Sequence, residues 1–154
     1  ADFFKSSDIV IDDNNIIFAN SSSIFSISSN NGYLNWKKNI GSKNTPIING
    51  NNVFLVSDNG YFVNLDKRSG KVIWSTNILK VLKKKKQKTK ISGFVMGSGK
   101  IYAVSQNGYL IICSAISGNI EYSKKIGDPI TVPPIISNGS LYILTENSRI
   151  LGFN

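Results

Sequence analysis

Few side chains in this sequence could carry out catalysis. The chain of 154 residues has one cysteine, Cys113, and no histidine. Without imidazole there is no Ser-His-Asp triad, no Cys-His pair and no paired-histidine zinc motif. A single cysteine also excludes an internal disulfide and a cluster of thiolate metal ligands. The composition therefore excludes most familiar hydrolase and metalloenzyme designs. We expect no catalytic residues, no metal site and no cofactor.

Asp58 is the one carboxylate whose neighbours resemble the start of a calcium-binding loop. Such a loop needs alternating acidic residues and a closing glutamate, and residues 58–61 (Asp-Asn-Gly-Tyr) lack both. The Asn-Gly pair instead predicts a tight hairpin turn, because it accepts positive φ at both central positions. Residues 106–108 contain the same pair. We interpret both segments as turns.

Basic residues are concentrated in residues 80–90. Seven of the 18 lysines and arginines lie there, and the remaining eleven face nine acidic residues. This insert has neither arginine nor an aromatic residue, so it does not resemble a nucleic-acid-binding surface. We interpret it as a solvated loop, with contact to an acidic partner or an anionic lipid surface as the alternative. The candidate contact residues are Lys83, Lys84, Lys85, Lys86, Lys88 and Lys90.

An internal repeat organises the chain. Residues 53–61 match residues 101–109 without a gap, residues 141–147 repeat the start of the same segment, and residues 32–36 match residues 70–74. The repeat length is about 40 residues, which is typical of stacked structural units. The lysine-rich insert lies between two units. The predicted units are residues 7–40, 44–78, 91–126 and 128–154.

Each unit has the pattern of four short strands. In the second unit these are residues 46–48, 53–57, 61–66 and 71–76, with turns rich in Asn, Gly, Asp and Ser between them. A lone four-stranded antiparallel sheet cannot cover its own faces, so it must pack on copies of itself. The sequence therefore predicts an all-β fold, with about four β-propeller blades in one domain over residues 1–154.

This strand order makes two further predictions. The links between units, including the lysine-rich insert, should lie at the same end of the blades as the turns between second and third strands. The last unit ends on its third strand, so its outermost strand must come from elsewhere. Residues 1–5, which include two adjacent phenylalanines, are a candidate for that strand.

Residues 64–74 resemble the tryptophan-docking motif of pyrroloquinoline-quinone-like (PQQ-like) propeller repeats, in which Asp, Gly and Trp follow at this spacing. The first unit keeps the Gly and the Trp, and the third unit keeps the Gly and has Tyr for Trp. In that family the tryptophan packs flat between neighbouring blades, so the resemblance implies buried structural side chains. The predicted blade-docking residues are Trp36, Trp74, Tyr122, Gly32, Gly70, Gly118 and Asp66.

Two branches of that family are relevant. Quinoprotein dehydrogenases hold their quinone and calcium with an adjacent pair of cysteines, a calcium-binding Glu or Asn and an aspartate base. Cys113 has no neighbouring cysteine and aligns with Ile27, Leu65 and Phe153, so we expect it in the core of a strand. The sequence is more similar to the other branch, the BamB-type outer-membrane assembly factors. That resemblance implies a non-catalytic periplasmic scaffold at the outer membrane, with a BamA-like β-barrel assembly component as its partner.

The sequence departs from that branch in two respects. It has no lipid-carrying cysteine at its N-terminus, and it supplies about half of the eight blades that are usual in the branch. We therefore expect the C-terminal part of a longer exported protein whose signal is not in this chain. Alternatively, two copies complete the ring as a homodimer, or four blades close on themselves.

Two other function classes remain open. One is a sensing or adhesion ectodomain built from the same repeats, in which Asn20 and Asn138 would be glycosylation positions. The other is a degenerate fragment of a quinoprotein dehydrogenase. Glycan occupancy would favour the first class, and quinone-dependent dye reduction would favour the second.

Overall fold

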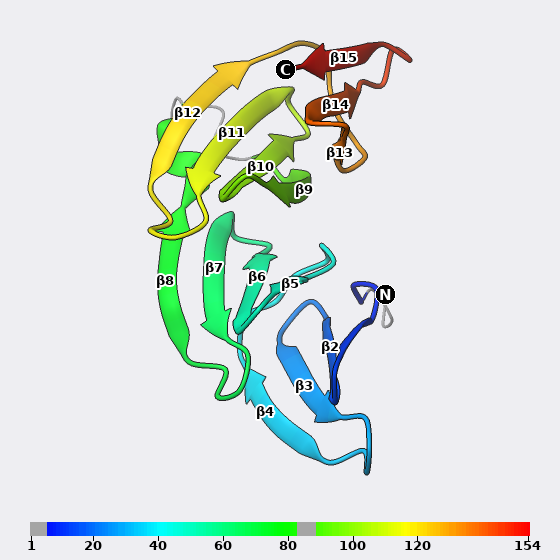
Figure 1. Cartoon of the computed structure of the whole chain (residues 1–154). Coiled ribbons are helices and arrows are strands. Elements are labelled where there is room, and N and C mark those ends of the chain that lie inside the picture. The colour runs from blue at the N-terminus through cyan, green and yellow to red at the C-terminus, as the bar shows by residue number, and fades with distance from the viewer. Residues whose placement is uncertain (1–5, 83–88) are drawn as a thin grey trace. The chain divides into compact units, whose positions relative to one another are not determined.

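The computed structural model describes residues 6–82 and 89–154, and almost all of its regular elements are strands (Figure 1). The chain divides into two compact units, Ala1–Ser75 and Thr76–Asn154.

The first unit contains two sheets, which we call blade 1 and blade 2. In both, consecutive strands are antiparallel neighbours, so each sheet is a simple meander. The last strand of blade 2 runs across the boundary into the second unit. Blade 1 consists of β1 (Val10–Asp12), β2 (Asn15–Ala19), β3 (Ile24–Ser28) and β4 (Leu34–Lys38), and blade 2 of β5 (Ile47–Asn49), β6 (Asn52–Val56), β7 (Tyr61–Asp66) and β8 (Val72–Asn77).

The second unit begins with a short 3-10 helix, η1 (Ile78–Val81), and contains blades 3 and 4. Among the described residues, blade 4 has only three strands, with β15 at an edge of the sheet. The all-β propeller fold and the shortened last blade confirm the sequence-based predictions. Blade 3 consists of β9 (Ile91–Gly97), β10 (Lys100–Ser105), β11 (Tyr109–Ser114) and β12 (Ile120–Lys125), and blade 4 of β13 (Ile135–Ser137), β14 (Ser140–Leu144) and β15 (Ile150–Phe153).

The turns between second and third strands differ from the prediction. In residues 58–60 the positive φ is confined to Gly60, at 75°, and the Gly60 amide donates to the Ser57 carbonyl at 2.9 Å. This is a three-residue loop that needs one left-handed residue, and not a two-residue turn that needs two. Two-residue turns with positive φ at both positions do occur, at 98–99 and 138–139, where they join first to second strands.

The links between blades lie beside the loops that join second and third strands, as predicted. The Gly41 carbonyl accepts a hydrogen bond from the Asp58 amide at 3.0 Å, and the Lys90 carbonyl accepts one from the Gln106 amide at 2.9 Å. Lys90 therefore lies at the predicted end of its blade. The candidate contact residues Lys83, Lys84, Lys85, Lys86 and Lys88 lie outside the described residues, as does the candidate closing strand at residues 1–5.

Each unit has an apolar core between its two blades. Successive side chains of a strand point to opposite faces of its sheet. Each blade can therefore pack one face on the other blade of its unit. In the first unit the core consists of Ile17, Ala19, Ile24, Trp36, Val53, Leu55, Val63 and Leu65. In the second unit it consists of Val104, Leu110, Ile130, Leu141 and Ile143. The strand registers put Leu141 opposite Phe153 as they put Val53 opposite Leu65, so the two units repeat one arrangement.

Cys113 lies on β11 and is buried, as the repeat alignment predicts. Burial disfavours the thiolate and raises the pKa of Cys113 to about 12. The thiolate is the nucleophilic form, so this cysteine is a core residue and a poor nucleophile.

Candidate functional site

The turn between β7 and β8 is built by its own residues. The Asp66 carboxylate accepts hydrogen bonds from the Ser69 amide at 2.8 Å and from the Ser69 hydroxyl at 2.6 Å. These hydrogen bonds lower the pKa of Asp66. The Gly70 amide then donates to the Asp66 carbonyl at 2.8 Å, with Gly70 at a φ of 66°. We call residues 66–70 the docking turn.

Trp36 of blade 1 lies under the docking turn of blade 2. Its indole Nε1 donates to the Lys67 carbonyl at 2.8 Å, and the side chain is only 7% exposed. The turn rests directly on the ring, because a Cβ added at Gly70 would lie 2.6 Å from Trp36 Cδ2. Glycine at this position is what allows the contact.

The side chain of Lys67 forms a second connection to blade 1. Its ammonium group pairs with the Asp12 carboxylate and lies 3.5 Å from the carboxylate of Asp13, at the turn between β1 and β2. Lys67 is buried, and the hydrogen bond to Asp12 raises its pKa. One turn of blade 2 therefore holds blade 1 through an indole and through an ion pair. The repeat pattern predicts the indole contact but not the ion pair.

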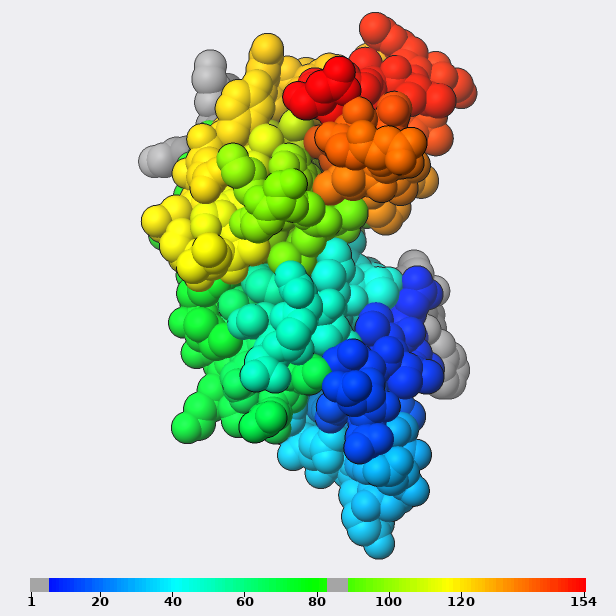
Figure 2. All heavy atoms as spheres, viewed as in Figure 1, coloured from blue at the N-terminus to red at the C-terminus, as the bar shows by residue number. Residues whose placement is uncertain are grey.

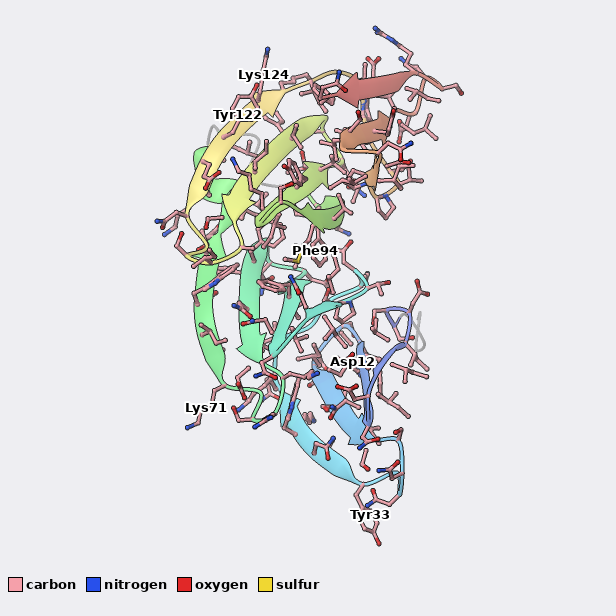
Figure 3. All side chains as sticks on the ribbon, in the orientation of Figure 1. Asp12, Tyr33, Lys71, Phe94, Tyr122 and Lys124 are labelled. Carbon is pink, nitrogen blue, oxygen red and sulfur yellow. The ribbon has the colours of Figure 1, made fainter. Side chains whose placement is uncertain are left out.

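Tyr122 is the counterpart of Trp36 in the second unit, and the expectation that it is buried is wrong. Tyr122 pairs with Ile112 as Trp36 pairs with Ser26, yet it is 45% exposed (Figure 3). The reason lies in blade 4. Phe153 corresponds to Leu65 in the strand register, so Asn154 matches Asp66, the first residue of the docking turn. No described residue occupies the place over Tyr122 that the docking turn occupies over Trp36.

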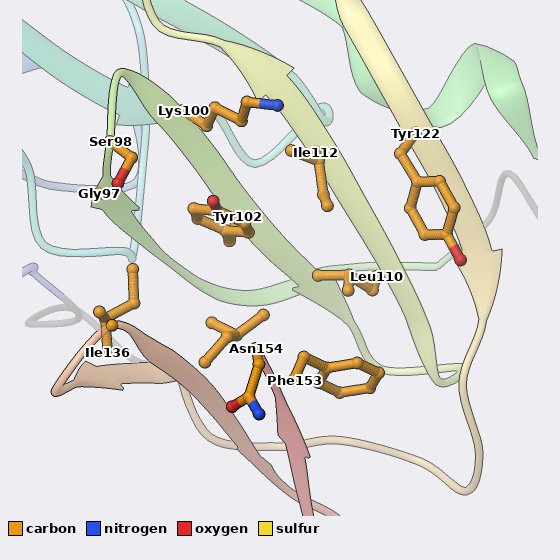
Figure 4. A pocket seen from close by; sticks show the side chains of 12 residues that line it. Gly97, Ser98, Lys100, Tyr102, Leu110, Ile112, Tyr122, Ile136, Phe153 and Asn154 are labelled. Carbon is orange, nitrogen blue, oxygen red and sulfur yellow. The ribbon is translucent and has the colours of Figure 1, made fainter.

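A pocket of about 410 Å³ opens at this place (Figure 4). The rings of Tyr102, Tyr122 and Phe153 line it together with Ile112 and Leu141. At its rim Lys100 forms an ion pair with Glu121 at 3.0 Å, which raises the pKa of Lys100. The pocket is thus apolar and aromatic, with one ion pair at the edge. We call it the blade 4 pocket.

Trp74 has a different environment from Trp36. It is half-buried, and its ring centroid lies 6.0 Å from that of Phe54. Its indole Nε1 is buried without a hydrogen-bond partner among the described residues. Gly32 and Gly118 have the same left-handed φ as Gly70, at 73° each, but a Cβ added at Gly32 would meet no atom within 4 Å. Of the predicted docking set, Trp36, Asp66 and Gly70 are brought together.

The described residues hold no group of three or more Cys, Asp and Glu side chains that could bind a metal ion. Lys90 is exposed, at the end of its link. None of the helices within residues 6–82 and 89–154 is long and apolar enough to cross a membrane.

Comparison with known proteins identifies repeats similar to these. Residues 5–76 match the family described as outer membrane protein assembly factor BamB. No curated protein is similar enough in sequence to count as a relative.

Several solved structures share the fold. The structure of BamB from Moraxella catarrhalis is 18% identical and has a TM-score of 0.74, covering 95% of this chain and 44% of that chain. Quinohemoprotein alcohol dehydrogenase from Comamonas testosteroni is 16% identical and has a TM-score of 0.63. The match covers 77% of this chain and 20% of that chain. The computationally designed protein Ika4 is 9% identical and has a TM-score of 0.71. The match covers 96% of this chain and 91% of that chain. The chain thus spans less than half the length of the BamB structure, and these likenesses show the propeller fold.

Proposed function

Because the chain carries PQQ-like repeats of the BamB-like family, we propose that it is a non-catalytic protein-binding scaffold. The observation that carries this proposal is the family match over residues 5–76, which includes both partners of the Trp36 contact. Cys113 is buried with a raised pKa, which argues against the cysteine chemistry of quinoprotein relatives.

The finer proposal is that the scaffold acts in the periplasm, at the outer membrane, in the assembly of β-barrel proteins. Its partner would be a BamA-like assembly component. The family that matches residues 5–76 is described as an outer membrane protein assembly factor, which supports this role. A formal net charge of +9 favours contact with an acidic partner or an anionic surface.

Binding of a purified BamA-type component to the 154-residue chain tests this proposal. We expect saturable binding with a Kd of about 1 to 100 μM, as for a transient interface, and no reduction of dye when pyrroloquinoline quinone and calcium are added. Saturable dye reduction would contradict the scaffold function, and absence of binding would contradict the assembly role.

A charge-matched pair of variants locates the contact. Replacing the lysines of the insert by serine should weaken binding most at low salt, because the insert concentrates positive charge. The insert variant changes Lys83, Lys84, Lys85, Lys86, Lys88 and Lys90, and the control variant changes Lys37, Lys38, Lys43, Lys71, Lys124 and Lys125. Equal weakening by the two variants would argue against a localised contact.

The outer faces of the first and last blades support a homodimer that completes a ring. Phe18 and Phe25 stack at 5.2 Å on the face of blade 1 that blade 2 does not cover. On blade 4, Leu144 is 44% exposed and Ile150 is 72% exposed. Exposed apolar sheet faces favour association. We expect light scattering to give twice the mass of the chain, falling to the single mass for the variant Phe18→Lys/Phe25→Lys. A monomer with a cooperative melting transition would contradict the dimer.

A further inference from the structure

The link between blades 1 and 2 forms one wall of a second pocket, inside the first unit. After β4 the Ile40 amide donates to the Lys38 carbonyl at 2.9 Å, which is a tight turn that ends the strand. Gly41 then lies against blade 1, because a Cβ added there would overlap the Ser21 carbonyl. The link thus runs where blade 1, blue in Figure 2, lies directly against blade 2, cyan to green.

This pocket has a volume of about 290 Å³, and all the residues that line it lie between Ser21 and Ser75. We call it the Asp58 pocket. Its apolar part consists of Ile40, Val63 and Val72, of which Val63 is buried. A cavity of this size is small for a drug-like molecule and suits a single side chain.

Asp58 is the only charged residue among the described residues that line the pocket. Its Oδ1 accepts a hydrogen bond from the Lys43 amide at 3.3 Å. Within residues 6–82 and 89–154, no lysine or arginine side chain forms an ion pair with it. Asn39 and Asn59 add carboxamide groups to the lining. The pocket therefore has one unpaired negative charge and several oxygen acceptors.

The loop does not require a carboxylate at position 58. The Asp58 amide donates to the link carbonyl of Gly41, and in blade 3 the Gln106 amide donates to the link carbonyl of Lys90 in the same way. A neutral side chain thus serves the loop of blade 3 equally well. The negative charge of Asp58 is available to a ligand.

We propose that the Asp58 pocket binds the side chain of an arginine that a protein partner presents. The proposal rests on the proposed function only in that the arginine belongs to a protein. The pocket is a place on the scaffold where one cationic side chain fixes the position of the partner.

An arginine side chain matches the lining in three ways. Its aliphatic stem packs along Val63 and Val72 while the charged group stays at the mouth. Its guanidinium presents five N–H donors and no acceptor, which suits carboxylate and carboxamide oxygens better than the three donors of a lysine. Tyr61 also lines the pocket and is 39% exposed, so its ring is available to a cation.

Titration of the nitrogen-15-labelled full chain with N-acetylarginine amide, followed by NMR, tests the proposal. We expect saturable shifts of the amides of residues 39–41 and 57–61, with a Kd of about 1 to 10 mM. N-acetylcitrulline amide has the same shape without the charge and should bind about two- to fivefold more weakly, as for the loss of an exposed ion pair. Absence of saturable shifts at these residues, or equal affinity for the two compounds, would overturn the proposal.

A charge-matched pair of variants tests the role of Asp58. Asp58→Asn keeps an oxygen for the Lys43 amide and removes the charge, so its affinity for the arginine compound should fall to that for the citrulline compound. The control is Glu146→Gln, because the Glu146 amide donates to the Pro129 carbonyl as the Asp58 amide does to Gly41, and Glu146 does not line the pocket. Melting curves show that both variants are folded. Equal weakening by the two variants would assign the effect to net charge and overturn the proposal.

A second pair of variants tests the tyrosine. Tyr61→Ala should lower the affinity for the arginine compound about two- to fivefold, because the cation loses the face of the ring. The control is Tyr33→Ala, since Tyr33 is 74% exposed at a turn of blade 1 and does not line the pocket (Figure 3). Identical affinities for these two variants would contradict the assigned site.

Binding of a BamA-type component separates the pocket from the proposed function. We expect Asp58→Asn to weaken that binding about two- to fivefold and Glu146→Gln to leave it unchanged. Unchanged binding of the component by Asp58→Asn, with binding of the arginine compound lost, would overturn the assignment of the arginine to this partner. Absence of the component's binding to the unaltered chain, with the arginine compound still bound, would contradict only the assembly role.

Discussion

Replacing Trp36 by alanine is expected to lower the free energy of unfolding by about 3 to 5 kcal/mol, as for other large buried aromatic side chains. Trp36 belongs to the core of the first unit and is 7% exposed, so the substitution leaves a cavity. It also removes the donor to the Lys67 carbonyl, and an unsatisfied buried acceptor adds to the loss. Urea unfolding followed by circular dichroism measures the effect.

Two further variants separate the contributions at Trp36. Trp36→Phe keeps an aromatic ring but removes the indole N–H, and should recover part of the loss. Tyr122→Ala is the matched control, because Tyr122 has the same position in its blade and is 45% exposed. We expect it to lower the free energy of unfolding by about 1 kcal/mol or less. Equal losses for Trp36→Ala and Tyr122→Ala would contradict the account of the docking turn.

The contrast between Trp36 and Tyr122 shows what could be predicted from the sequence. Strands follow from local information: alternating apolar residues and glycine-containing turns predicted residues 61–66, the bounds that the structure has for β7. The environment of a docking side chain depends instead on the next blade. The motif around Tyr122 says nothing about whether a turn lies over it, and the prediction of its burial failed for this reason.

The same limit explains the other differences from prediction. The Lys67 ion pair joins residues of two blades, and no signal within either repeat indicates that Asp12 and Lys67 meet. The loops at Gly60 and Gly108 contain the predicted Asn-Gly pairs, but one additional loop residue changes which position must be left-handed.

Gly70→Ala provides the sharpest test of the docking contact. Gly70 has a φ of 66°, which costs about 1 to 2 kcal/mol for an alanine. The new Cβ would also lie 2.6 Å from Trp36 Cδ2, and such overpacking adds about 1 to 3 kcal/mol. Gly32→Ala is the matched control, because Gly32 has a φ of 73° and open space around it. We therefore expect Gly70→Ala to destabilise the protein by about 2 to 5 kcal/mol and Gly32→Ala by the backbone cost alone.

A double-mutant cycle assigns the difference to the indole. In the Trp36→Ala background the ring that meets the new Cβ is absent, so Gly70→Ala should cost no more than Gly32→Ala does in the unaltered protein. The interaction free energy of the cycle is then about 1 to 3 kcal/mol and equals the clash that has been relieved. Urea unfolding curves for the unaltered protein, Trp36→Ala, Gly70→Ala and the double variant give the four free energies of unfolding from which this number is calculated. If Gly70→Ala cost the same with and without Trp36, the docking turn would not rest on the indole.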